Sequence, residues 1–232
     1  MKKYVVLLFT LISINVFSQK NNISLQGGVA MPSSSDMIEI SKTIGYCTGV
    51  DYFRTLYSEK KYKYTLGLIV DFKTALFRVA DNFLIEGNPY SANVTWGHSY
   101  REFSFGLGLS PQREIGNSGF FVGVNTELIG LYNIEPSVGF STYIMDDYGN
   151  LYSTLGDVQI DNGLSIGYDL GVSFYKMFSN NFGIGLQIDW LSSRRTTTTY
   201  TTITTPVFVQ SQNDVKEKID YLCGQLKCVY SF

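Results

Sequence analysis

The sequence predicts an all-β fold: an eight-stranded antiparallel up-and-down transmembrane β-barrel with short periplasmic turns and long extracellular loops. Three features of the chain support this prediction. It begins with the residue order of an export signal, it contains segments that alternate between apolar and small or polar residues, and its short connections alternate with long ones.

The first residues have the order of a secretory signal peptide. Lys2 and Lys3 precede an apolar run from Val5 to Phe17, and Ser18 follows it. This run is 13 residues long, shorter than the roughly 20 that a membrane-spanning helix needs. We therefore expect residues 1–18 to be a cleaved signal peptide rather than an uncleaved helical anchor, and residues 19–232 to form one outer-membrane barrel domain.

Composition excludes several functional classes. The formal charge is −2 and no run of five like charges occurs, so nucleic-acid binding is not expected. No apolar stretch reaches 18 residues, whereas Gly, Tyr and Phe number 22, 17 and 16, as in strands with aromatic girdles. Cys47, Cys223 and Cys228 lack metal-ligand spacing. We expect them to be small apolar fillers, with one disulfide as the alternative, and we expect no cofactor.

Strands are predicted wherever large apolar residues alternate with Gly, Ser, Asn or carboxylates. The segment 164–175 shows the pattern most clearly, with Leu164, Ile166 and Tyr168 on one face and Asp169 on the other. A last segment ends the chain, and the others span residues 22–31, 43–55, 61–73, 99–110, 120–128 and 182–191.

The connections distinguish a membrane barrel from a soluble one, which alternation alone does not do. Short links at 56–60, 111–119 and 176–181 alternate with long ones, as expected for periplasmic turns and extracellular loops. A soluble core would also rarely accept so many buried acids. The long links span residues 32–42, 74–98, 132–163 and 192–217.

The last strand supports the same conclusion. Leu226, Tyr230 and Phe232 share one face, and Phe232 is an aromatic terminal residue. This resembles the signal by which the barrel-assembly machinery recognises its substrates. The mature chain resembles the small outer-membrane β-barrel proteins of Bacteroidota, which include porin-like proteins and the barrel component of the type IX secretion apparatus. The resemblance implies the outer membrane as location and its lipid as surroundings, but no catalytic signature.

Six carboxylates are predicted to face the lumen and to form a loose belt at mid-barrel. An eight-stranded barrel has an interior just wide enough for side chains, so we expect a closed polar plug. Lys61, Lys63, Lys73 and Lys227 are the inward cations found on the strands, and most lie near a rim. Because an unpaired buried carboxylate is costly, we expect some acids to hold a proton, or an arginine such as Arg78, Arg194 or Arg195 to reach inward. The acids are Asp51, Asp71, Glu102, Glu127, Asp169 and Asp189.

Two further segments carry functional alternatives. Hydrolysis by a Ser-His-acid arrangement would have to use His98, the only histidine, but its neighbour Ser99 points to the opposite face of a strand. The Thr-rich segment after Arg195 is either a solvated loop or an extension of the seventh strand, whose edge could bind a partner. We therefore expect a non-enzymatic plugged barrel with surface loops for partner contact or envelope integrity. The alternatives are a narrow pore or a subunit of a secretion or envelope-assembly complex, and, more remotely, a lipid-modifying enzyme.

Overall fold

The computed structural model describes residues 21–40, 44–60, 62–78, 82–84, 91–97, 99–134, 138–145, 148–160, 163–203 and 209–232. The expected signal peptide and His98 lie outside these residues. No helix in the described part of the chain is long and apolar enough to cross a membrane.

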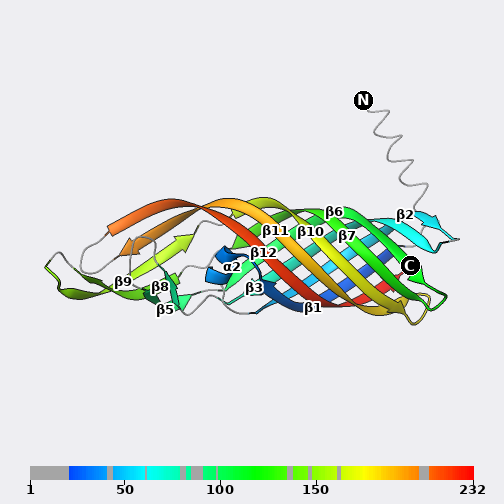
Figure 1. Ribbon diagram of the computed structural model, residues 1–232, viewed down its shortest axis with the longest axis horizontal. Coiled ribbons are helices and arrows are strands. Elements are labelled where there is room, and N and C mark those ends of the chain that lie inside the picture. The colour runs from blue at the N-terminus through cyan, green and yellow to red at the C-terminus, as the bar shows by residue number, and fades with distance from the viewer. Residues whose placement is uncertain are drawn as a thin grey trace, which may run out of the picture.

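Eight long strands form a closed antiparallel ring in which each strand pairs with its neighbours along the barrel (Figure 1). The ring closes because β1 pairs with β12 and β10 pairs with β11. This confirms the predicted eight-stranded up-and-down barrel. Its strands are β1 (Asn21–Pro32), β2 (Gly45–Glu59), β3 (Tyr64–Phe77), β6 (Tyr100–Ile115), β7 (Phe120–Ile134), β10 (Gly163–Met177), β11 (Phe182–Ile203) and β12 (Val209–Ser231).

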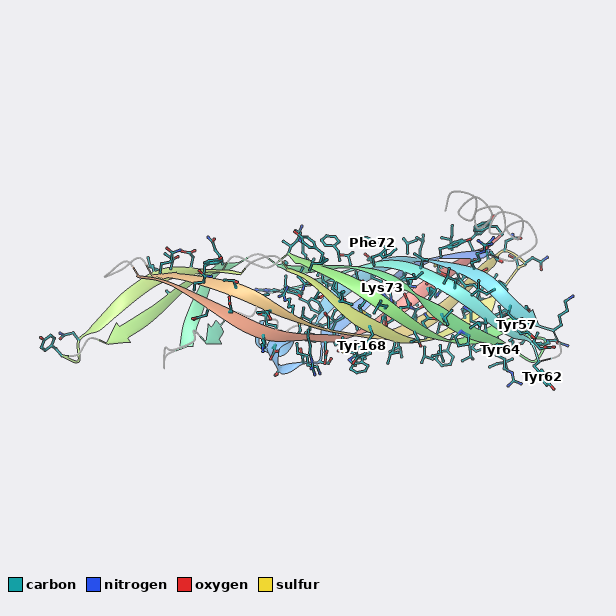
Figure 2. The ribbon with its side chains drawn as sticks, turned by 90° about the horizontal axis from the view of Figure 1, so that it is seen from above. Tyr57, Tyr62, Tyr64, Phe72, Lys73 and Tyr168 are labelled. Atoms are coloured by element: carbon teal, nitrogen blue, oxygen red, sulfur yellow. The ribbon has the colours of Figure 1, made fainter. Side chains whose placement is uncertain are left out.

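The outer wall of the ring is apolar and exposed. Each of the eight strands contributes large side chains to it, while the alternate residues point inward. Phe72, for example, is 49% exposed, whereas the next residue, Lys73, is 3% exposed; Figure 2 shows both on β3. An apolar exterior with a polar interior is the pattern of a barrel in lipid. One exposed residue from each strand is Leu25, Val50, Phe72, Leu107, Leu128, Leu170, Ile188 and Leu226.

Short turns join the strands at the end of the barrel where the described chain has its N- and C-terminal residues (Figure 1). Gly116 and Gly119, in the turn between β6 and β7, have φ angles of 64° and 68°, which favour glycine. Tyr57, Tyr62 and Tyr64 lie at the same end (Figure 2), where aromatic residues are typical of a membrane interface. Pro111 lies within β6 instead of ending the strand as expected, and the β6–β7 pairing is interrupted there because proline has no N–H to donate.

The opposite end carries a sheet that projects beyond the ring (Figure 1). β11 and β12 remain paired up to Ile203 and Val209, and β9 (Leu151–Ile160) joins the outer part of β11. β8 (Val138–Met145), β5 (Ser91–Gly97) and β4 (Asn82–Leu84) follow in that order. The long connections 74–98 and 132–163 therefore contain strands that the sequence analysis did not predict. Of these four described strands, only β9 pairs with the outer part of β11, and β8, β5 and β4 each pair with the strand before them in this order. These are long-range contacts that local alternation does not reveal.

A short helix, α2 (Ser35–Ile40), lies in the connection between β1 and β2, beside β12 (Figure 1). The amide of Met37 donates to the hydroxyl of Ser34 at 3.3 Å, which is an N-cap contact. Met37 is 1% exposed and belongs to the apolar cluster that also contains Ile219 and Tyr221. The helix therefore fixes the first long connection against the barrel mouth.

Candidate functional site in the barrel lumen

The lumen contains all six carboxylates that the sequence analysis assigned to it. Each lies on a different strand of the ring and none is more than 2% exposed. Alternation within each strand brings them there, because inward positions recur at every second residue. The carboxylates are Asp51 on β2, Asp71 on β3, Glu102 on β6, Glu127 on β7, Asp169 on β10 and Asp189 on β11.

One lysine contacts three of these acids. The ammonium of Lys73 lies 2.8 Å from Asp71 Oδ2 and 3.1 Å from Asp189 Oδ2, and it donates a hydrogen bond to Asp169. Lys73 thus joins β3 to β10 and β11 across the lumen. This layer contains more carboxylates than cations, since Glu127 also belongs to it.

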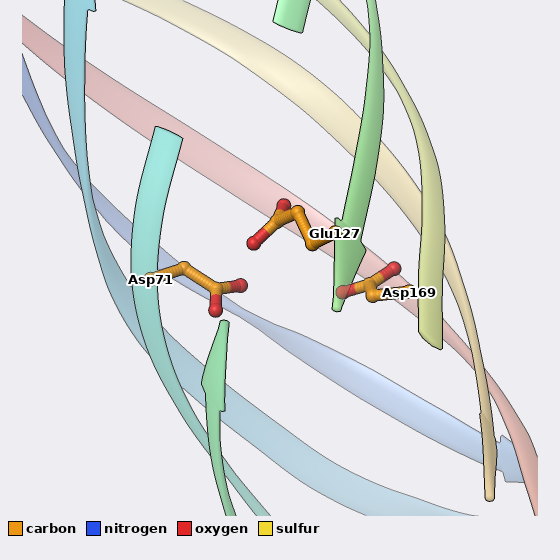
Figure 3. Close-up of side chains that lie close together, drawn as sticks. All are labelled: Asp71, Glu127 and Asp169. Atoms are coloured by element: carbon orange, nitrogen blue, oxygen red, sulfur yellow. The ribbon is translucent and has the colours of Figure 1, made fainter. Parts of the chain in front are cut away.

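Glu127 lies between Asp71 and Asp169 (Figure 3). Each of these three residues offers an oxygen within 4.8 Å of the others. Among the described residues, neither carboxylate oxygen of Glu127 has a hydrogen-bond partner. Gly106 on β6 makes this approach possible, because a Cβ there would lie 2.1 Å from Asp71 Oδ1 and 2.4 Å from Glu127 Oε2.

A second layer is centred on Lys227 of β12. Its ammonium lies 2.7 Å from Asp51 Oδ2 and donates to Gln187 Oε1 at 2.9 Å. The amide of Gln26 also donates to Asp51, and the amide of Gln187 donates to both oxygens of Asp189 at 2.9 Å. Gln187 therefore links this layer to that of Lys73. Neither glutamine was among the predicted site residues, although their inward positions follow from the same alternation.

Glu102 occupies a third layer, toward the projecting sheet. The hydroxyl of Tyr221 donates to Glu102 Oε1, and that of Tyr100 donates to Oε2 at 3.3 Å. With the Asn133 amide in its hydrogen-bonding orientation, its nitrogen donates to Glu102 Oε2 at 3.0 Å and its oxygen accepts from Arg195 at 2.6 Å. Arg195 also contacts Glu217 Oε2 at 2.7 Å. An arginine thus points inward, from the strand β11 rather than from a loop.

The other candidate cations lie elsewhere. Lys63, predicted to belong to the lumen network, lies at the periplasmic rim, where it donates to the Gly116 carbonyl and to Asn117 and lies 3.6 Å from Glu114 Oε2. The reason is that β3 begins at Tyr64, so Lys63 belongs to the turn. Arg78 and Arg194 are exposed, and Lys61 lies outside the described residues.

Apolar side chains close the lumen on the side of the Lys73 layer that faces the projecting sheet. They form one buried cluster that includes Cys47 and Cys223, both of which are free thiols. Toward the short turns, Tyr175 donates to Gln112 at 2.7 Å and stacks on Phe121 with ring centroids 5.0 Å apart. Side chains therefore fill the described lumen at several levels. The cluster comprises Ala30, Met37, Cys47, Ala75, Phe77, Tyr100, Ile129, Leu131, Leu191, Ile219, Tyr221 and Cys223.

The remaining candidate residues lie on the outer surface. Leu226, Tyr230 and Phe232, the expected assembly signal, are 63%, 53% and 55% exposed. The third cysteine, Cys228, shares their face and is exposed. At the other end of the barrel, a groove of about 550 Å³ lies where the ring meets the projecting sheet. Its lining is mostly charged and comprises Asp36, Arg194, Arg195, Thr196, Lys216, Glu217 and Lys218.

The closed hydrogen-bonded ring, the apolar wall and the polar plug together determine the class of fold, because only helices and closed barrels satisfy every backbone group in lipid. The fold is that of an outer-membrane β-barrel. A barrel with this wall lies in an outer membrane.

Solved structures of outer-membrane proteins align with this chain, and the first of them supports this fold. A major outer membrane protein from Thermus thermophilus aligns with a TM-score of 0.51 at 14% identity, over 93% of this chain and 100% of that one. Neisserial surface protein A aligns at 0.39 and 12% identity, over 92% and 95%. Ail of Yersinia pestis, solved with the heparin analogue sucrose octasulfate, aligns at 0.41 and 12%, over 92% and 99%. No family model and no curated protein matches the sequence.

Proposed function

We propose that this chain is a non-enzymatic scaffold of the outer membrane, whose plugged barrel holds the projecting sheet at the cell surface for contact with a protein partner. The observation that carries the proposal is the continuity of β11 and β12, which run from the lipid-facing ring into the projecting sheet without a break. A sheet held by two such strands has a fixed orientation to the membrane. Residues 1–18 act as the export signal, and the terminal strand is read by the barrel-assembly machinery, as in the small barrels of Bacteroidota.

The outer half of β12 offers an edge for strand addition. Up to Glu217 it pairs only with β11 among the described residues, whereas α2 covers the next stretch of the edge. There the Lys218 amide donates to Asp36 at 2.6 Å, and Ser34 Oγ donates to the Lys218 carbonyl at 2.6 Å. An uncovered strand edge is a template for another strand.

The geometry indicates how to test this edge. Because Lys218 directs its N–H toward α2, alternation directs the N–H of Asp214 to the same open side. Asp214→Pro removes that donor and leaves the β11 ladder intact, and Asp214→Ala is the matched control. A photo-crosslinker at Gln212 in living cells should capture a defined partner with the alanine variant and lose it with the proline variant. Equal capture by both variants would contradict strand addition.

The filled lumen argues against the rival function of a narrow pore. In a planar bilayer we expect the wild-type barrel to show no steady ion-conducting events, because Lys73, Lys227 and the apolar cluster cross the lumen. Steady conductance would contradict the plugged scaffold.

The projecting sheet favours one second candidate, a subunit of a secretion or envelope-assembly complex. Purification in mild detergent tests it. Co-elution with stoichiometric partner chains would support this role, and a lone monomer would count against it. Lipid modification, the remote alternative, would require His98, and an unchanged acyl chain number in lipid A after His98→Ala would exclude that histidine's role.

A further inference from the structure

The three carboxylates around Glu127 are brought together by the register of four adjacent strands. Asp71 on β3 pairs with Gly106 on β6, and Glu127 on β7 pairs with both Gly108 and Asp169. Their oxygens lie within 4.8 Å of one another, and Figure 3 shows the three side chains converging. Because all three lie on paired strands in mid-barrel, none can withdraw into solvent.

Among the described residues, the acids of this layer outnumber the cations that contact them. Asp71, Glu127, Asp169 and Asp189 surround the single ammonium of Lys73, which contacts three of them. Lys227, the nearest other lysine in the lumen network, contacts Asp51. Buried charges are tolerated when they are paired or bind a metal.

The surroundings of Glu127 provide a second line of evidence besides the number of charges. Glu127 is 2% exposed, and both of its carboxylate oxygens lack hydrogen-bond partners among the described residues, as does Asp169 Oδ1. The space that Gly106 leaves is occupied by the oxygens of Asp71 and Glu127, so any side chain there would separate them. Both oxygens of Glu127 and Oδ1 of Asp169 thus lack donors among the described residues, whereas Oδ2 of Asp71 and Oδ2 of Asp169 contact Lys73.

We propose that Asp71, Glu127 and Asp169 bind a divalent cation, Ca²⁺, inside the barrel. A donor set made only of carboxylate oxygens suits hard cations. Oxygens on opposite sides of Ca²⁺ lie about 4.6–5.2 Å apart, and on opposite sides of Mg²⁺ about 4.0–4.2 Å. Separations of at most 4.8 Å lie within the span available around Ca²⁺. The ion would reduce the excess of three negative charges in the layer to one and lock three strands together.

Metal content tests the proposal directly. The full mature chain is extracted from membranes in mild detergent, passed over a chelating resin and analysed by mass spectrometry for bound calcium. We expect one calcium ion per wild-type chain and none in Glu127→Gln, since loss of a direct ligand should weaken binding by more than the about 10–100-fold typical of an outer-shell partner. The control variant Asp51→Asn, in the Lys227 layer, should keep the calcium ion. If Asp51→Asn does not fold, Glu102→Gln serves as the control instead.

Thermal unfolding gives a second readout that does not depend on trapping the ion. Added CaCl₂ should raise the unfolding midpoint of the wild type, because the ion binds only the folded chain, and it should leave Glu127→Gln unchanged. In the presence of a chelator, Glu127→Gln should be at least as stable as the wild type, since one repelling charge is gone. The proposal would be overturned if the wild type contained no calcium and its unfolding midpoint did not change with CaCl₂. It would also be overturned if the wild type and Glu127→Gln contained equal amounts of calcium.

Discussion

The ammonium of Lys73 on β3 donates a hydrogen bond to the carboxylate of Asp169 on β10, although β6 and β7 separate these strands in the ring. The contact therefore crosses the lumen rather than following the wall. Together with the contacts to Asp71 and Asp189, it makes Lys73 the central cation of the plug.

Lys73→Met should destabilise the barrel more than a lysine change at the rim. Removing the cation leaves buried carboxylates uncompensated, and breaking a buried ion pair from one side typically costs about 3–5 kcal/mol. Lys63→Met is the control, because Lys63 is partly exposed and its ion pair at 3.6 Å should contribute less than about 1 kcal/mol. Urea unfolding in lipid vesicles measures both. An equal decrease in the free energy of unfolding of both variants would show that Lys73 does not stabilise the lumen acids.

Arg195 and Arg194 are neighbours with opposite environments. Arg195 is 7% exposed and contacts Glu217, whereas Arg194 is exposed on the outer face. Arg195→Met should leave Glu217 uncompensated and destabilise the base of the projecting sheet by about 3 kcal/mol, so proteases should cut the β11–β12 hairpin faster. Arg194→Met should be cleaved at the wild-type rate. Identical cleavage of the two variants would contradict the assigned contacts.

Inward glycines should be far less replaceable than outward ones. A Cβ at Gly108 would lie 2.0 Å from the Thr126 carbonyl oxygen, whereas a Cβ at Gly130 would meet nothing within 4 Å. Gly108→Ala should therefore cost about 1–3 kcal/mol, the range for overpacking, and Gly130→Ala close to nothing. Heat-modifiability on gels gives the order of stability. If both variants match the wild type, the close approach of β7 to Gly108 does not limit stability.

The export signal has a separate test. Cleavage after Ser18 should leave Gln19 as the first residue of the protein in the membrane, because the small residue follows the apolar run directly. Intact-mass measurement of the membrane-extracted protein decides this. A mass that still includes Met1 would show that the segment is retained.

Much of the ring could be predicted from the sequence, because lipid outside and a packed lumen inside impose a strict period of two. Residues such as Asp169 and Ile188 could be assigned to a face from their place in the two-residue alternation alone. The strands of the projecting sheet could not, since β9 joins the barrel only where Thr199 to Ile203 extend β11 beyond the ring. Up to Ile203 the Thr-rich segment thus forms a strand extension, so the expectation of a solvated loop was wrong there.

Within the lumen, the two-residue alternation predicted which residues point inward but not which of their side chains contact one another. Lys73 contacts Asp189 across the barrel because of the stagger of the strands, which the sequence does not display. The prediction that Lys63 belongs to the lumen network was wrong for a local reason. It has a φ angle of 51° in the turn before β3, so the alternation of the strand does not extend to it.

Cysteine labelling of living cells tests the central claim most directly. The native cysteines are buried in the lumen, as Cys47 and Cys223 are, or lie on the lipid-facing wall, as Cys228 does, so they should not react with a membrane-impermeant maleimide. Gln212→Cys, on the projecting sheet, should be labelled on intact cells, and Asn180→Cys, in a short turn, only after the outer membrane is opened. Labelling of Asn180→Cys on intact cells, with Gln212→Cys protected, would contradict a barrel that holds this sheet at the cell surface.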